Sequence, residues 1–152
     1  PWCFPTERQR RRSVPPVSGY AKPLPRITPD NGLFWEAARR HELRLQRCLD
    51  CGRVWYPPAP VCPGCLSDRH EWAPMSGRGT VSSFVVFHKA WFPAFANETP
   101  YAVVQMELEE GPRLTANLVD VPPGEIRVGM RVTVVFDDIT PEISIPRFRR
   151  AP

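Results

Sequence analysis

Four cysteines follow the pattern C-x2-C-x10-C-x2-C, at Cys48, Cys51, Cys62 and Cys65. A Cys-x-x-Cys turn can place both of its sulfurs on one side of a tight loop, and two such loops joined by a hairpin can enclose a tetrahedral cage of four sulfurs. Four thiolates leave no open coordination position for water or substrate. The spacing therefore predicts a zinc ion that is structural and contributes to folding stability.

Three other uses of these thiols are weaker. We expect a cytoplasmic chain, which disfavours disulfides, because that compartment keeps thiols reduced. A redox-active Cys-x-x-Cys is disfavoured because two pairs occur and no βαβ pattern surrounds them. Iron in the same cage, which would serve electron transfer, is a possible metal but is less favoured than zinc. His70 follows Cys65 by five residues and could replace one ligand, but four cysteines already complete the shell.

Catalytic residues are hard to find in this chain. The three histidines, His41, His70 and His88, lie on different predicted elements, and no serine stands in a nucleophile-elbow context. His88 is the best candidate for a general base, but no partner for it is evident. The acidic groups beside predicted turns are interpreted as solvated: Glu107, Glu109, Glu110, Asp137 and Asp138. We expect no enzymatic activity from this chain by itself.

An aromatic segment, "HKAWFPAFANETPY", connects two predicted strands over residues 88–101. It carries Trp91, Phe92 and Phe95 within five residues. A loop this long is often functional, and large aromatic side chains on a loop favour a binding surface. The alternative is that one or two of them plug the end of a barrel. We expect the loop to contact a partner protein or an acyl chain.

The elements that must position these residues are mainly strands. Twenty prolines in 152 residues argue against a helical fold. One short helix is expected within residues 28–43, capped by Thr28 or Asp30, with an apolar face of Leu33, Phe34, Ala37 and Ala38. The two short strands of the metal ribbon are expected at residues 44–48 and 52–58. Five further strand candidates follow, at residues 77–90, 101–108, 114–121, 128–136 and 143–148.

Alternation in these later strands predicts one buried face each, which a barrel or sandwich can cover. Over residues 101–108 the inward set is Ala102, Val104, Met106 and Leu108; over residues 128–136 it is Val128, Met130, Val132, Val134 and Phe136. Three segments are expected: an arm or linker at residues 1–29, the helix and ribbon at 30–75, and the barrel at 76–152.

The charge of the chain is concentrated at its start. The isoelectric point is about 9.1 and the net charge is +4, but residues 1–29 hold six basic side chains against Glu7 alone. The remainder is therefore slightly acidic, which disfavours a chain that binds phosphates along its folded face.

No apolar run is long enough to span a bilayer. The chain begins with Pro1, as expected of a processed chain or a piece of a longer one.

Taken together, these pieces resemble the thiolase-associated family of former unknown function, which joins a rubredoxin-like zinc ribbon to an OB-fold. The matching stretches are residues 34–65, 77–88, 100–121, 126–136 and 146–149, so that the resemblance covers about residues 30–150. One departure is Leu66, since glycine often follows the last cysteine of such turns. The resemblance implies a mainly β fold: a short N-terminal helix, the ribbon, and a C-terminal five-stranded barrel.

The resemblance also implies a role. Members of this family are generally non-catalytic subunits of hetero-oligomers with thiolase-superfamily enzymes, thiolases or aldolases, that act on acyl-CoA thioesters, as in steroid side-chain degradation. Some relatives are fused to a hydratase domain of hot-dog fold. We expect docking through Trp35 and the aromatic loop, with acyl-CoA at or near the interface. The alternative is a module that binds single-stranded nucleic acid. Residues 101–120 disfavour it, because such binding needs aromatic and basic side chains and these residues offer one tyrosine, one arginine and several acids.

Overall fold

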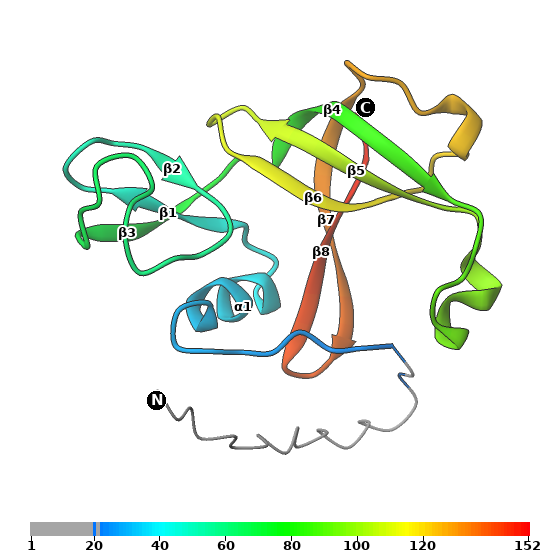
Figure 1. The fold of residues 1–152 in the computed structure, drawn as a ribbon, viewed down its shortest axis with the longest axis horizontal. Helices are drawn as coiled ribbons and strands as arrows, with labels where there is room; N and C mark the ends of the chain where they lie inside the picture. Colours follow the sequence, from blue (N-terminus) through cyan, green and yellow to red (C-terminus); the bar gives the residue numbers. More distant parts are fainter. Residues whose placement is uncertain (1–19, 21) are drawn as a thin grey trace, which may run out of the picture.

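The computed structural model describes residues 20 and 22–152, so most of the predicted arm lies outside the described residues. The described chain is mostly strands with one short α-helix, as predicted (Figure 1). Its elements in order are α1 (Gly32–Arg39), β1 (Arg44–Cys48), β2 (Val54–Trp55), β3 (His70–Pro74), β4 (Arg78–Phe87), η1 (Pro93–Glu98), β5 (Tyr101–Leu108), β6 (Arg113–Val119), η2 (Pro123–Glu125), β7 (Arg131–Thr140) and β8 (Ile143–Arg150). None of the described helices is long and apolar enough to cross a membrane.

The metal ribbon is a three-stranded antiparallel sheet in the order β2-β1-β3. Gln46 at its centre lies opposite Trp55 on one side and Trp72 on the other. The sequence predicted β1 and β2 but not β3. The segment "HEWAP" has no apolar alternation, and its pairing with β1 bridges more than twenty residues of intervening chain.

The barrel closes in the order β4-β5-β6-β8-β7. Its pairs are antiparallel except for β6 with β8, which run parallel. This is the five-stranded, partly open Greek-key barrel of an OB-fold. The inward face predicted for β5 is confirmed, since Ala102, Val104, Met106 and Leu108 are all buried. In the predicted strand at residues 128–136, Val128 is instead 65% exposed, because β7 begins only at Arg131.

Helix α1 packs against β8 and β1. Phe34, Ala37 and Ala38 are buried as predicted, but Leu33 is 52% exposed and does not belong to the apolar face. The predicted cap is also wrong. The residue before the helix is Asn31, and its side chain does not cap the first turn; Asn31 Oδ1 accepts instead from the backbone N–H of Thr28 at 2.7 Å.

One hydrophobic cluster runs through the helix, the ribbon and the barrel. It contains Phe34 from α1, Leu45 and Ala73 from the ribbon, and Val104 and Phe148 from the barrel. A second, smaller cluster holds Cys48, Trp55 and Cys62 at the outer end of the ribbon. The boundary predicted between residues 75 and 76 falls between β3 and β4, but it stays a prediction because the core is shared across it.

Candidate functional site

The four predicted metal ligands come together at the outer end of the ribbon. All four sulfurs lie within 4.8 Å of one another, with Cys48 and Cys65 3.5 Å apart and Cys51 and Cys62 3.6 Å apart. A tetrahedral zinc site with Zn–S bonds near 2.3 Å has sulfur–sulfur edges of about 3.8 Å. The cage therefore fits a tetrathiolate zinc ion. Two of the sulfurs belong to buried residues, Cys48 and Cys62, and two to exposed ones.

Each Cys-x-x-Cys pair folds into the same type of turn. The N–H of Gly52 donates to the carbonyl of Cys48 at 3.1 Å, and the N–H of Leu66 donates to the carbonyl of Cys62 at 2.9 Å. Both turns end in a left-handed residue, with φ of +72° at Gly52 and +62° at Leu66. Leu66, which stands where such turns often have glycine, thus adopts a backbone conformation that costs less free energy for glycine.

Backbone donors favour thiolates at two of the four cysteines, whereas at Cys65 the donor at Ser67 is outweighed by the neighbouring sulfurs and by burial, which raise the pKa to about 12. The N–H of Cys51 lowers the pKa of Cys48 to about 7 against the effect of burial, with a smaller contribution from Asp50. Burial raises the pKa of Cys62, but donors at Cys65 and Gly64 outweigh it, so that the pKa is lowered. One of these is the N–H of Gly64, 3.3 Å from the sulfur. Thiolate character at these positions suits a divalent cation, since metal binding requires deprotonated sulfurs.

His70 is a structural residue that orders the ribbon. Its Nδ1 lies 3.0 Å from the carbonyl oxygen of Asp68, and its Nε2 lies 2.9 Å from Nε2 of Gln46. Nδ1–H therefore donates to the carbonyl, and Nε2 accepts from the Gln46 amide. Gln46 is 2% exposed, and its Oε1 accepts from the N–H of Ala59 at 2.8 Å. Both ring nitrogens are thus engaged, and His70 is not a ligand of the cage.

The aromatic loop lies at the other end of the molecule, between β4 and β5 (Figure 1). Trp91 is 66% exposed and Phe92 is 57% exposed, so neither plugs the barrel. Phe95 is half-buried, with its ring centre 5.7 Å from that of Tyr101 and 6.4 Å from that of Phe92. Lys89 Nζ lies 4.8 Å above the Trp91 ring. The loop thus presents two large aromatic side chains on a half-buried aromatic base.

Trp35 and His88 do not belong to this exposed aromatic surface. Trp35 lies on α1, half-buried, with its ring edge-on against Phe34 at 5.0 Å, so that much of it supports the core. His88 is exposed, and no hydrogen-bond partner for it occurs among the described residues. A general base that acts on a bound group needs to be oriented. The geometry therefore gives no support to His88 as a catalytic residue.

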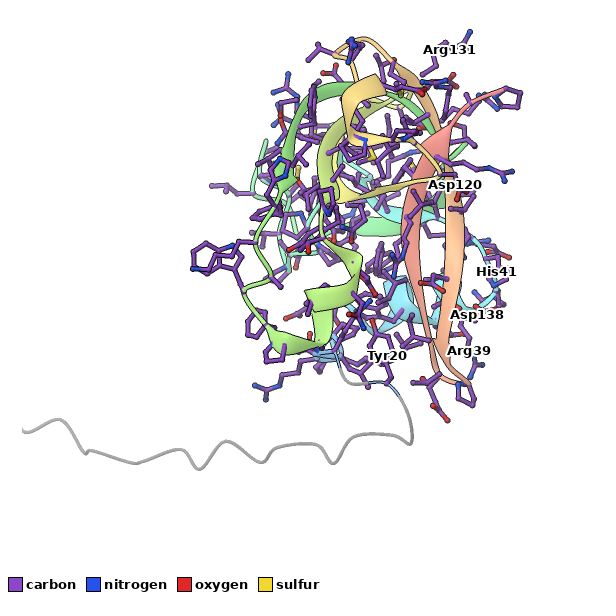
Figure 2. The ribbon with its side chains drawn as sticks, turned by 90° about the vertical axis from the view of Figure 1, so that its right-hand side faces the viewer. Tyr20, Arg39, His41, Asp120, Arg131 and Asp138 are labelled. Atoms are coloured by element: carbon purple, nitrogen blue, oxygen red, sulfur yellow. The ribbon has the colours of Figure 1, made fainter. Side chains whose placement is uncertain are left out.

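Sequence reasoning missed a polar cluster at the β7–β8 hairpin. Asp138 accepts hydrogen bonds from the Ser144 hydroxyl and from His41 Nε2, the latter at 2.8 Å (Figure 2). A shallow pocket beside it is lined by Arg39, Asp138, Ile139, Thr140, Pro141 and Ser144. A serine nucleophile must give its proton to the histidine, whereas Ser144 gives its proton to the carboxylate. The cluster is therefore not a catalytic triad.

Comparison with known proteins places both halves of the chain in one family. Residues 35–71 match the domain described as "ChsH2, rubredoxin-like zinc ribbon domain", and residues 72–137 match "ChsH2, C-terminal OB-fold domain". A solved structure titled "Ltp2-ChsH2(DUF35) aldolase" contains a chain that is 40% identical, with a TM-score of 0.77. The match covers 85% of this chain and 100% of that one.

Two curated relatives are subunits of hydratases. One is the "Probable enoyl-CoA hydratase alpha subunit" of Thermomonospora curvata, 41% identical over 130 residues that make up 86% of this chain and 40% of the relative. The other is the "3-oxo-4,17-pregnadiene-20-carboxyl-CoA hydratase alpha subunit" of Mycobacterium tuberculosis, 36% identical over 75% of this chain and 36% of the relative. The chain thus spans less than half the length of these two relatives.

Proposed function

Because the chain belongs to the ChsH2 family, which joins a rubredoxin-like zinc ribbon to an OB-fold, we propose that it is a non-catalytic accessory subunit of a thiolase-superfamily enzyme. It docks on a thiolase or aldolase that acts on acyl-CoA thioesters and helps to form or stabilise the acyl-CoA site. The names of these relatives support this role: the related chain belongs to an aldolase that also contains Ltp2, and the hydratase relatives are named for CoA thioester substrates.

One observation carries the proposal. The most exposed aromatic side chains of the described residues, Trp91 and Phe92, project from the barrel rather than fill it. Exposed tryptophan and phenylalanine side chains that lie together are typical of the centre of a protein interface. Meanwhile the sulfur cage is closed, and Ser144, Asp138 and His41 are arranged as a structural cluster. Among residues 20 and 22–152, the chain therefore has a surface to offer a partner, and neither of these two groups of side chains is arranged as a reactive centre.

The zinc ion supplies rigidity in this role. The four cysteines that would hold it also pin the turns at Gly52 and Leu66, and the resulting ribbon packs through Leu45 and Ala73 onto the shared core. A metal-locked ribbon can keep its shape against the barrel while the barrel surface contacts another protein. The hydratase fusion expected from the resemblance stays a prediction, supported by the two longer relatives.

The nucleic-acid alternative has little support from the barrel surface. Strands β5 and β6 form the face on which OB-folds bind nucleic-acid strands. On this face the cation of Arg113 is paired with Glu107 at 3.3 Å, and the ring of Tyr101 is stacked on Phe87 at 5.1 Å. Stacking platforms for bases need free aromatic rings and uncompensated cations. The face therefore lacks both features.

The proposal is tested by mixing the full chain with the Ltp2 subunit of the related aldolase at micromolar concentrations. Size-exclusion chromatography with light scattering should show one hetero-oligomer, and the complex should bind an acyl-CoA more tightly than either subunit alone. Separate elution of the two proteins contradicts the docking role. A complex with unchanged acyl-CoA affinity keeps the docking role but removes the contribution to the acyl-CoA site.

A further inference from the structure

One edge of the barrel is open along the second half of β4. This strand pairs with β5 over almost its whole length, but with β7 only through residues 78–80. A β-bulge follows between Val81 and Ser83. The last bonds on the β7 side join Val81 to Met130 and Gly129, each at 2.9 Å. Beyond that point, residues 83–87 have a strand on one side only within the part of the chain that the structure describes.

The exposed edge has the chemistry of a strand-pairing site. In an antiparallel pair, alternate residues point their N–H and C=O groups away from the partner strand. Proteins usually protect such edges with charged side chains, prolines or covering elements. The edge "SFVVF" at residues 83–87 contains no charge and no proline. Phe84 is 39% exposed and Val85 is 48% exposed, so that this edge is apolar, partly exposed and without the usual charges or prolines.

Exposed apolar side chains also lie near both ends of the edge. At its far end β4 leads directly into the loop that carries Trp91 and Phe92 (Figure 1). At its near end lies Val128, 65% exposed, next to the Gly129 that bonds to Val81. Only residues 88–90 separate the edge from Trp91, so that a protein bound to the loop is in position to cover the edge.

We infer that an extended segment of the acyl-CoA enzyme adds to residues 83–87 as a further β-strand. Main-chain hydrogen bonds to β4 supply much of the affinity in this mode. Apolar side chains on one face of the added strand lie beside Phe84, and those on its other face lie beside Val85, because consecutive strand residues point to opposite faces. The added strand carries no charge opposite the edge, because a buried unpaired charge there would be costly. This inference rests on the proposed function and names the docking mode of the same partner.

A second copy of the chain fits the edge less well. Antiparallel self-pairing centred on Val85 brings Lys89 of one copy opposite Val81 of the other. The backbone groups of Val81 that face this edge are already bonded to Met130 and Gly129. A separate extended segment can turn away before it reaches Val81, so this constraint does not apply to it.

Single-residue hydrogen exchange of the full chain, free and with the Ltp2 subunit, tests the inference. In the free chain, alternate amides of residues 83–87 should exchange quickly, because only those facing β5 are bonded. In the complex these fast amides should slow by about tenfold or more, whereas amides of β5 change little. A complex that forms while these amides stay fast overturns the inference and leaves the proposed function standing. If no complex forms, both fail.

The same hydrogen-exchange measurement distinguishes the enzyme segment from other possible partners of residues 83–87. Protection that appears in the chain alone and increases with its concentration would assign the edge to a second copy. Protection in the chain alone at every concentration would assign it to residues 1–19 of the chain itself. Either result overturns the inference.

A matched pair of variants supplies an independent readout. Val85→Lys places a charge on the edge, and Leu49→Lys places one at a similarly exposed position on the ribbon, 53% exposed against 48%. Val85→Lys should weaken the complex by about tenfold or more, since charged edges resist strand pairing. Leu49→Lys should weaken it much less. Equal effects of the two variants, with unchanged protection of β5 amides, would contradict a role for the edge.

Discussion

His41 and Asp138 join the helix to the barrel across almost a hundred residues of sequence. His41 Nε2 donates to Asp138 Oδ1 at 2.8 Å, directly after α1, while Asp138 lies on β7. The imidazole is also stacked on Phe136, with ring centres 5.3 Å apart and planes 6° from parallel. His41 has a φ of +59°, so the chain turns sharply there to bring the ring onto the barrel. This contact helps to set where the helix and ribbon lie on the barrel.

Removal of the Asp138 charge should lower stability in a pH-dependent way. The Ser144 hydroxyl, followed by His41, holds the pKa of Asp138 below its usual value. A carboxyl with a lowered pKa in the folded chain stabilises it fully above the unfolded pKa, and this stabilisation is lost as pH falls through the folded pKa. Asp138→Asn should therefore unfold at a lower temperature than the parent near pH 5, and the difference should shrink below about pH 4.

Thermal unfolding of both chains over a pH series measures this difference. Asp30→Asn is the control, since Asp30 is exposed and has no ion-pair partner among the described residues. A difference between parent and Asp138→Asn that grows toward acid pH would contradict the assigned role.

Leu66→Gly should stabilise the ribbon. Leu66 has a φ of +62° and is 76% exposed, so its side chain adds strain and little packing. Relief of left-handed strain, less the extra chain entropy of glycine, should raise the unfolding free energy by about 0.5–1 kcal/mol. The reverse change at the equivalent turn, Gly52→Leu, should lower it by a similar amount. Zinc-loaded protein unfolded in denaturant gives both values, and two changes of the same sign would contradict the shared turn geometry.

Metal removal should unfold the outer ribbon and leave the barrel folded. Cys48, Trp55 and Cys62 form a small cluster that depends on the cage, whereas Leu45 and Ala73 belong to the large shared core. A strong chelator should expose Trp55 and speed amide exchange across residues 48–69, while amides of β5 stay protected. Elemental analysis should give one zinc ion per chain, and the protein should be colourless. A coloured protein with bound iron would instead support electron transfer.

Truncation of the aromatic loop should weaken the complex and spare the fold. Trp91 and Phe92 are the most exposed aromatic side chains of the described residues, so that their loss costs little packing. Trp91→Ala and Phe92→Ala should each weaken binding to the Ltp2 subunit by about 2 kcal/mol, roughly 30-fold in Kd. Leu49→Ala, exposed to a similar degree on the ribbon, should have little effect. Titration calorimetry supplies the affinities, and an unchanged Kd for both loop variants would remove this surface from the interface.

Local pattern in the sequence was enough for the metal cage and for most of the barrel. Cysteine spacing predicted the four clustered sulfurs because each turn is built within four residues, and the alternation from Ala102 to Leu108 predicted a buried strand face because side chains alternate along every strand. The order of these pieces also predicted the family.

Tertiary structure alone decided the contacts between distant segments. Strand β3 forms because His70 and its neighbours pair with β1. Asp138 becomes part of a cluster only because His41 and Ser144 form hydrogen bonds with it. The open edge of β4 depends on where β7 stops pairing with it. No periodicity encodes these features, because each depends on which residues far apart in the chain become neighbours once the loops between them are closed.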